Sequence, residues 1–348
     1  MALGAHLAAE DRSLNLVHSW ANDYDSSTCK TYLRNIPGAT ETSVLSGDVR
    51  DLKIESLSEI DGFAFGFPCN DFSQVGEQKG TEGDFGPLYK YGVEVLGHFN
   101  PSWFIAENVG GLRSSNEGQA FRQILKELSE VGVFGGYDLV PHLYRFEEYG
   151  VPQARHRILI VGIRKDLGVQ FKVPARGPYA KADVSARTAL TQPPISPDAA
   201  NNERTKQDPR VVDRLNHIAP GKNAFNSDLP NHLELNVKGA KISQIYRRLH
   251  PDRPSYTVTG SGGGGTHVYH WSEPRALTNR ERARLQTFPD SFVFEGGRGD
   301  VRRQIGMAVP VQGARVVFRA LFDSLAGIPY ESEMSNLDKH LTAVTDTR

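Results

Sequence analysis

The chain has 348 residues, a length that suits two domains or one large domain with an insertion. A net charge of −1 excludes a strongly basic protein, so any nucleic-acid site must be a local basic face. Two cysteines cannot make a disulfide framework or a four-cysteine zinc site. With no apolar stretch of membrane-spanning length either, we expect a protein of the reducing cell interior without a bound metal.

The first half of the chain alternates predicted helices and strands. Residues 2–10 favour a helix that precedes the first strand. The predicted strands cover 14–20, 43–45, 60–67, 103–107, 137–144 and 157–161, and the predicted helices that separate them cover 26–32, 88–96 and 121–131. Such alternation predicts an α/β domain with a parallel, doubly wound, Rossmann-like sheet.

The character of the sequence changes after residue 164. Residues 165–275 are rich in Pro, Asn, Asp and Arg, and they predict a second, smaller, irregular and mostly β domain. Residues 276–330 return to a periodic pattern and are expected to complete the first domain, 1–164. Within them we predict a helix at 278–287, a strand or loop at 305–310 and an amphipathic helix at 312–325. The tail, 331–348, is polar and expected to be loosely held.

One predicted strand delivers a cysteine to a loop. The apolar run Phe63 to Phe67 is followed directly by Pro68 and Cys69 and then by a polar stretch closed by Gly76. The carboxyl ends of strands in an open α/β sheet are where ligands bind. Cys69 is therefore a candidate nucleophile, although a free cysteine is more often a small buried hydrophobic residue.

Four further stretches give this cysteine a context. They are Glu107-Asn108-Val109, Gln153-Ala154-Arg155-His156-Arg157, the segment from Arg275 to Asp290, and Gln304-Ile305-Gly306-Met307-Ala308-Val309-Pro310. In this order, and together with Pro68-Cys69, they resemble the DNA (cytosine-5-)-methyltransferase family. The resemblance covers roughly residues 1–165 and 241–325, and its motifs are specific only in combination.

The reaction of that family requires these residue types. Cytosine C5 becomes nucleophilic when a thiolate adds at C6, and Cys69 is the candidate because Cys29 lies in a predicted helix without a site around it. Glu107, at a neighbouring strand end, can hold the ring N3. Arg155 and Arg157 are expected to share one face of a strand and to orient the base, the nucleophile or a phosphate.

The resemblance implies S-adenosylmethionine as the methyl donor. Asp23 would bind the ribose hydroxyls, Tyr24 would stack on the adenine, and Asp48 would accept from the adenine amino group. The full set implied for the donor is Asp23, Tyr24, Asp48, Val49, Pro68, Leu88, Met307 and Val309.

A cytosine in double-stranded DNA must be flipped out to be reached, and the irregular region 165–275 suits the grip on DNA that this needs. The glycine run 260–265 matches a dinucleotide-binding pattern, but a strand-like segment follows it, so we expect a close approach to DNA instead. The residues implied for DNA binding are Gln153, Gln244, Arg247, Thr257, Gly262 and Gly263.

Two departures from the family stand out. The chain opens at the equivalent of the helix that follows the family's first strand and Gly-rich donor loop. Either the start lies upstream, which we favour, or another chain supplies the missing piece, and we expect donor binding by these 348 residues to be weak. Met307 stands where the family usually has Asn, which removes a polar contact near the amino-acid end of the donor.

Alternatives to a DNA methyltransferase follow from the same residues. The missing loop permits a catalytically impaired DNA-binding homologue. A tRNA cytosine-5 methyltransferase is disfavoured because region 165–275 contains no cysteine. The leading interpretation is a prokaryotic enzyme of the cytoplasm, associated with the nucleoid, with a cognate restriction endonuclease as an expected partner.

Overall fold

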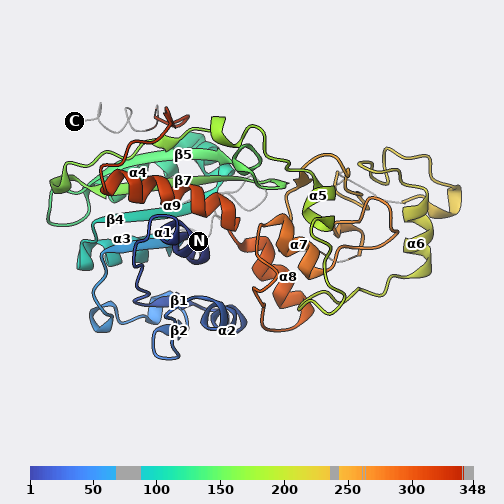
Figure 1. Cartoon of the computed structure of the whole chain (residues 1–348), viewed down its shortest axis with the longest axis horizontal. Helices are drawn as coiled ribbons and strands as arrows, with labels where there is room; N and C mark the ends of the chain where they lie inside the picture. Colours follow the sequence, from blue (N-terminus) through green and yellow to red (C-terminus); the bar gives the residue numbers. More distant parts are fainter. Residues whose placement is uncertain (68–87, 236–242, 261, 263, 339, 341–348) are drawn as a thin grey trace. The chain divides into compact units, whose positions relative to one another are not determined.

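A computed structural model describes every residue except 68–87, 236–242, 261, 263, 339 and 341–348, and it leaves out the side chains of 114–117 (Figure 1). The chain forms two compact units. The first contains Met1–Arg145, His156–Gly177 and Ala314–Arg348, and the second contains Phe146–Arg155 and Pro178–Gly313. Residues 276–313 thus pack with the second unit, whereas the sequence pattern suggested that 276–330 completes the first.

A mixed sheet forms the centre of the first unit. Its order is β3-β4-β7-β5, and its strands are β3 (Gly62–Gly66), β4 (Trp103–Val109), β7 (His156–Arg164) and β5 (Tyr137–Arg145). β3 and β4 are parallel, but β7 runs antiparallel to both β4 and β5. The α/β class is as expected, and the expectation of an all-parallel sheet was wrong.

Two short pairs of strands complete the first unit. β1 (Ala21–Asp23) pairs in parallel with β2 (Val44–Ser46), and β8 (Val173–Pro174) pairs with β10 (Ser332–Glu333). The strand expected at 14–20 is absent from this described segment. Val17 there is 74% exposed, and ladder pairing starts only at Ala21.

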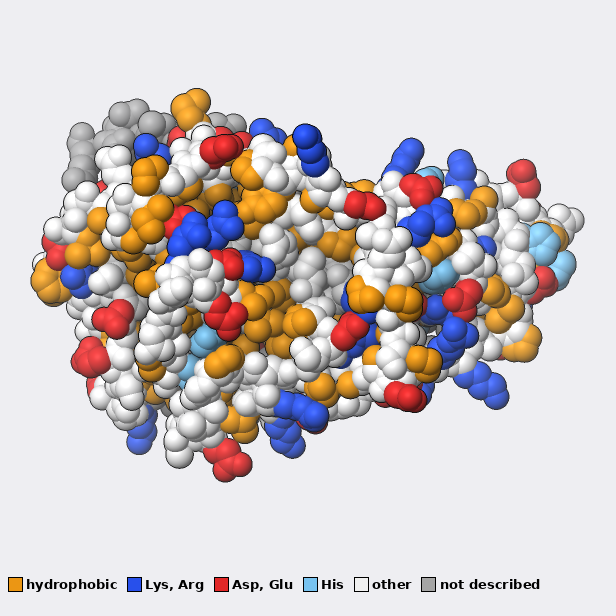
Figure 2. Space-filling model, in the orientation of Figure 1, with side chains coloured by type: hydrophobic (Ala, Val, Ile, Leu, Met, Phe, Trp, Pro, Cys, Tyr) orange, Lys and Arg blue, Asp and Glu red, His pale blue; other side chains and the backbone are white. Residues whose placement is uncertain are grey.

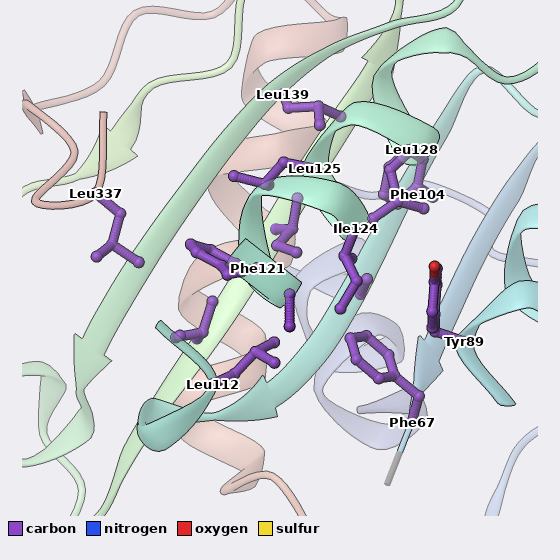
Figure 3. Close-up of a cluster of buried hydrophobic side chains, with 14 of the residues drawn as sticks. Phe67, Tyr89, Phe104, Leu112, Phe121, Ile124, Leu125, Leu128, Leu139 and Leu337 are labelled. Carbon is purple, nitrogen blue, oxygen red and sulfur yellow. The ribbon is translucent and has the colours of Figure 1, made fainter. Parts of the chain in front are cut away.

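Helices cover both faces of the main sheet. The helices of the first unit are α1 (Ala2–Glu10), α2 (Ser26–Asn35), α3 (Tyr89–Phe99), α4 (Gln119–Glu130) and α9 (Val311–Leu325), of which α9 enters the unit at Ala314 and α2 packs on β1 and β2. Ile124 and Leu125 of α4 pack with Phe104 and Ile158 in the apolar core (Figure 3). Trp103, next to Phe104, instead contacts Phe318 of α9, with ring centroids 5.8 Å apart. Successive side chains of a strand point to opposite faces, so α4 and α9 lie on opposite sides.

Residues 335–337, just after β10, are docked, so the expectation of a loose tail does not hold for them. Leu337 is 1% exposed within the same core as α4. The Asn336 side chain accepts from the backbone N–H of Leu143 at 2.9 Å and donates to its carbonyl at 3.0 Å. Residues 335–337 are therefore held by β5.

The second unit is irregular, as expected, but it contains few strand residues in its described part. β6 (Gln153–Ala154) pairs in parallel with β9 (Ser255–Tyr256). Its helices are α5 (Ala186–Thr191), α6 (Pro209–Asn216), α7 (Asn279–Leu285) and α8 (Arg298–Met307). The description as mostly β was wrong for these residues. Residues 305–307 are helical and end α8, and Pro310 separates it from α9.

Buried arginines hold the loops of the second unit together. Arg248 is 6% exposed and donates to the carbonyls of His270, Leu215 and Ile218. Arg280 is fully buried and donates to several carbonyls in the same way: those of Ala200, Pro289 and Phe292. Guanidinium groups thus satisfy carbonyls that have no ladder partner.

His270 organises a turn in this unit as a neutral side chain. It is 7% exposed, and its Nδ1 accepts from the backbone N–H groups of Ser272 and Glu273, each at 3.2 Å. Burial lowers the pKa of His270 to about 4. The positive charges of Arg275 and Arg248 act in the same direction, and the carboxylates of Glu281 and Glu273 oppose it.

We expect the free energy of unfolding to fall as the pH drops from about 6.5 toward 4. In this window the unfolded chain binds a proton at His270 that the folded protein does not, which costs about 1.4 kcal/mol per pH unit. Urea unfolding at about pH 7 and about pH 5 measures the slope. His270→Asn should reduce it and the exposed control His232→Asn should not. Equal slopes in all three proteins would refute the assignment.

Candidate active site at the carboxyl ends of β3 and β4

Two parallel strands end side by side where the sequence predicts the nucleophile. Gly66, the last residue of β3, is the register partner of Glu107 in β4. Phe67 follows Gly66 and is 7% exposed in the apolar core. Pro68 and Cys69 come next and lie outside the described residues. The described part of the site is therefore the edge at which β3 ends, three residues before Cys69 in the sequence.

Glu107 forms an ion pair with Arg157 at this edge. The Arg157 Nε lies 2.9 Å from Glu107 Oε1, and the two side chains are 14% and 15% exposed. The pairing of β4 with β7 brings them together, because Val109 is the register partner of Arg157. A nearly buried guanidinium fixes the direction of a carboxylate more firmly than a solvated one would.

A glycine makes room for the other carboxylate oxygen. A Cβ added at Gly66 would lie 3.1 Å from Oε2 of Glu107, which is tighter than ordinary contact. Glycine therefore lets the carboxylate lie over the end of β3, three residues before Cys69.

Asn108 ties the end of β3 to β4. It is 2% exposed, its Nδ2 donates to the carbonyl of Phe67 at 3.1 Å, and its Oδ1 accepts from the N–H of Val109 at 2.8 Å. The Phe67 carbonyl belongs to the peptide bond before Pro68. Asn108 therefore fixes the carbonyl of Phe67 just after β3, a role that sequence reasoning did not assign to it.

Arg155 lies elsewhere than expected. It follows β6 and belongs to the second unit, whereas Arg157 is in β7 of the first, so the expectation that both share one strand face was wrong. Arg155 is fully buried, and its guanidinium donates to the carbonyls of Val258 at 3.1 Å and Gly306 at 2.8 Å. The tight turn after Ala154 changes the direction of the side chain, which an alternating pattern does not reveal.

Two residues predicted to bind DNA have internal roles. Gln153 is fully buried, its Nε2 donates to the Leu285 carbonyl at 3.2 Å, and its Oε1 accepts from the Val258 N–H at 2.8 Å. A direct contact of Gln153 with DNA is therefore corrected to a structural role within the second unit. The hydroxyl of Thr257 donates to the carbonyl of Ala154 at 2.7 Å and joins the same strands.

The other positions assigned to DNA stay predictions. Arg247 places its guanidinium over the ring of Tyr256, 4.6 Å from the centroid, and Gln244 is half-buried in the preceding turn. Gly262 has a φ of +157°. Gly263 lies outside the described residues.

Residues assigned to the donor lie at the carboxyl ends of β1 and β2. Asp23 ends β1 and accepts from the N–H of Asp25 at 2.9 Å. The ring of Tyr24 is 76% exposed. Asp48 follows β2, where hydrogen bonds from the Arg50 side chain and backbone lower its pKa to about 2. Asp48 is thus a permanently ionised acceptor near neutral pH.

The remaining donor positions fall in both units. Val49 begins a short 3-10 turn after Asp48, and Leu88 precedes α3 in the first unit. Met307 and Val309 belong to the second unit. Met307 is 72% exposed at the end of α8, and Val309 is buried at 5%.

Other features of the described residues do not compete with this site. Cys29 lies in α2, and burial raises the pKa of its thiol, which disfavours the thiolate. A polar cavity of about 240 Å³ touches Asp61 and Ser102, before the other ends of β3 and β4. Among the described residues no group of His, Cys, Asp and Glu could hold a metal ion. One 18-residue window within Arg298–Leu325 is apolar enough to span a membrane, but 72% of that window is buried inside the protein.

We expect Asn108→Ala to lower the free energy of unfolding by about 1–3 kcal/mol, because it leaves the buried Phe67 carbonyl without its donor. Urea unfolding measures this change. Gln123→Ala removes an exposed amide from α4 and should change stability by less than about 0.5 kcal/mol. Equal stabilities of both variants would contradict the role given to Asn108.

A family model and related sequences match nearly the whole chain. The model described as C-5 cytosine-specific DNA methylase matches residues 2–323. Type II methyltransferase M.BbvI of Brevibacillus brevis is 58% identical over 325 residues, which cover 92% of this chain and 86% of the relative. Type II methyltransferase M.NgoFVII of Neisseria gonorrhoeae is 40% identical over 306 residues, which cover 84% and 77%.

Solved structures share the fold. An Escherichia coli protein described as a DNA modification methyltransferase encoded within a prophage superposes with a TM-score of 0.69 at 21% identity, covering 93% of this chain and 96% of that one. The Dnmt2 methyltransferase of S. pombe gives a TM-score of 0.54 at 18% identity, with coverages of 92% and 96%.

Proposed function

This chain belongs to the C-5 cytosine-specific DNA methylase family and is a DNA cytosine-5 methyltransferase that uses S-adenosylmethionine, and we propose that Cys69, Glu107 and Arg157 carry out its reaction. The observation that carries the assignment is the ion pair of Glu107 with Arg157 beside the end of β3. Three residues after Gly66 the chain reaches Cys69. A nucleophile, an acid and an orienting cation are thus linked to one sheet edge.

The proposed reaction is an addition of the thiolate to the cytosine ring followed by its elimination. The Cys69 thiolate bonds to C6 of a flipped cytosine while Glu107 hydrogen-bonds or protonates N3, so C5 gains the electron density. When bound, the donor would supply an electrophilic methyl group: C5 bonds to that methyl carbon while the bond from the methyl to the donor sulfur breaks, and the donor leaves as a neutral thioether. Loss of the C5 proton to a base then breaks the C6–S bond and releases Cys69 as thiolate. Arg157 keeps the Glu107 carboxyl turned toward the base.

The residues at the ends of β1 and β2 fit the donor. Asp23 and Asp48 offer carboxylates that accept from hydroxyl and amino groups. The exposed ring of Tyr24 offers an aromatic face. We propose that these side chains, with Val49 and Leu88, bind the adenosine part. Pro68, Met307 and Val309 remain assigned to the donor from the sequence.

We propose that the second unit binds double-stranded DNA and fills the gap left by the flipped base. Arg247 and Gln244, next to the glycine-rich segment with Gly262 and Gly263, are assigned to this contact. The internal bonds of Gln153, Arg155 and Thr257 support a rigid frame for it. We keep the predicted order of roles along the chain: 1–164 is assigned to catalysis, 165–275 to DNA recognition, and 276–330 to the return segment.

The type II relatives suggest the setting of the enzyme. Type II methyltransferases of bacteria are cytoplasmic, and we place this chain with them. We further propose that it acts at the nucleoid and protects host DNA from a cognate restriction endonuclease. Neither an impaired homologue nor a tRNA methyltransferase is favoured by these relatives.

We expect Glu107→Gln to lower kcat for methyl transfer to DNA about 10²- to 10⁴-fold, because an amide cannot give N3 a proton. Incorporation of a labelled methyl group into DNA measures it. Glu94→Gln, an exposed change on α3, is the control. DNA affinity should stay unchanged in both variants. A Glu107→Gln enzyme with the kcat of the control would remove Glu107 from the mechanism.

A covalent trap tests the nucleophile. DNA with 5-fluorocytosine at the target carries fluorine where the departing proton should be, so the enzyme should stay attached after methyl transfer. We expect a donor-dependent adduct, resistant to denaturant, with the wild type and with Cys29→Ser, and none with Cys69→Ser. An adduct that survives Cys69→Ser would exclude Cys69 as the nucleophile.

A further inference from the structure

The second unit contains a buried arginine without a carboxylate bonded to it in the described residues. Arg282 of α7 is 2% exposed. Its Nε donates to the carbonyl of Leu277 at 3.4 Å, and a terminal nitrogen lies 3.3 Å from Nδ1 of His267. By contrast Arg275 binds two glutamates, and Arg284 binds Asp290. The charge of Arg282 therefore faces neutral partners.

A second arginine approaches the same place from α8. Arg302 is half-buried, and its Nε is buried with no hydrogen-bond partner among the described residues. Its Nε and Cδ each lie 3.7 Å from the position that a Cβ on Gly262 would take. The neighbouring acid, Asp300, binds Arg303 at 3.0 Å instead.

His267 completes this group, which we call the Arg302 cluster: His267, Arg282 and Arg302 around Gly262. Its Nδ1 lies 3.8 Å from the Gly262 Cβ position. Burial, aided by the charges of Arg282 and Arg302, lowers the pKa of His267 to about 4. The ring is thus neutral near neutral pH, and because Arg282 can only donate to Nδ1, the ring proton sits on Nε2, which is therefore a donor.

The charge of the cluster is not balanced from within. Of the carboxylates, Glu281 acts on Arg282 from the same helix. Both Glu281 oxygens already accept from Arg275 at 2.7 Å, and one also accepts from the N–H of Thr278. Two guanidinium charges held close together in a partly buried place repel each other, so an anion between them would be stabilised.

We propose that Arg302 and His267, beside the backbone of Gly262, bind one phosphate of the DNA backbone, with Arg282 as the positioning residue. A phosphodiester offers oxygens that match guanidinium and imidazole donors. The absent side chain at Gly262 lets the sugar–phosphate chain approach closely. This inference rests on the proposed function, since it names a contact through which the second unit holds its DNA substrate.

The test measures DNA affinity against salt concentration for duplex DNA that carries the methylation site mapped in an expressing host. We expect Arg302→Gln to weaken binding about ten- to a hundredfold at low salt and to lower the slope of log K against log salt by about 0.9, the value for one phosphate. Arg302→Lys keeps the positive charge and should therefore retain most of the wild-type slope of log K against log salt. Arg303→Gln, on the same helix and paired with Asp300, is the matched control and should behave as wild type.

A scan with single neutral methylphosphonate linkages identifies the phosphate itself. At one particular linkage, the neutral substitution should weaken DNA binding by the wild type. At that same linkage it should cause no further loss of affinity in Arg302→Gln or His267→Gln, because these variants no longer contact that phosphate. This result also separates a DNA phosphate from a site for free phosphate, which no linkage would affect. If an Arg302 variant fails to fold, the His267→Gln comparison at that linkage still decides.

The outcomes separate this inference from the proposed function. A wild type that methylates DNA, with Arg302→Gln and His267→Gln showing its salt slope and its linkage profile, overturns the phosphate site and leaves the enzyme assignment intact. A wild type that neither binds nor methylates duplex DNA overturns both. Loss of the same linkage effect in both variants supports the inference.

Discussion

The pairing of β4 with β7 is the constraint on which the active edge depends. Seven register pairs run from Trp103 opposite Ile163 to Val109 opposite Arg157, through strands whose centres are buried. Glu107 and Arg157 are diagonal neighbours on one face, close enough for long side chains to meet. A slip of one residue would turn Arg157 to the other face and bury an unpaired carboxylate. The apolar core that fixes the strand register therefore also fixes the position of the Glu107 carboxylate. Asn108 of the same strand holds the carbonyl of Phe67 in place.

In the second unit, arginine side chains supply many of the hydrogen bonds that backbone carbonyls in the main sheet receive from neighbouring strands. Its loops have few ladder partners in the described part, and Arg155, Arg248 and Arg280 donate instead to carbonyls from separate segments. Each guanidinium offers five donors in a fixed plane, so one side chain can join several loops. These arginines donate to backbone carbonyls within the unit. Arg302 differs from Arg248 and Arg280, whose Nε atoms donate to the carbonyls of His270 and Ala200, because its own buried Nε has no partner among the described residues.

The sequence predicted most elements of the first unit because each has a strong period or an apolar run. It missed the direction of β7, since a strand reads the same whichever way it pairs. It also assigned Arg155 and Arg157 to one face, because alternation cannot show that the chain turns between β6 and β7. Cys69 and Glu107 were predicted as chemistry at strand ends, and Arg157 from its place in the stretch Gln153 to Arg157, and these roles stay predictions. Asn108 and Gly66 acquire their roles only from contacts across the sheet, and the Arg302 cluster joins residues distant in sequence.

The docked segment after β10 has a consequence for the behaviour of the protein in solution. Among the described strands β5 ends the order of the main sheet, so one side of its backbone would be open to another chain. Asn336 bonds the N–H and the carbonyl of Leu143 much as a neighbouring strand would, and Ser335 covers the Pro141 carbonyl. Edge strands exposed in this way promote aggregation, and proline within the strand is a further safeguard. Residues 335–337 therefore act as a shield that keeps the molecules from adding to one another's sheets.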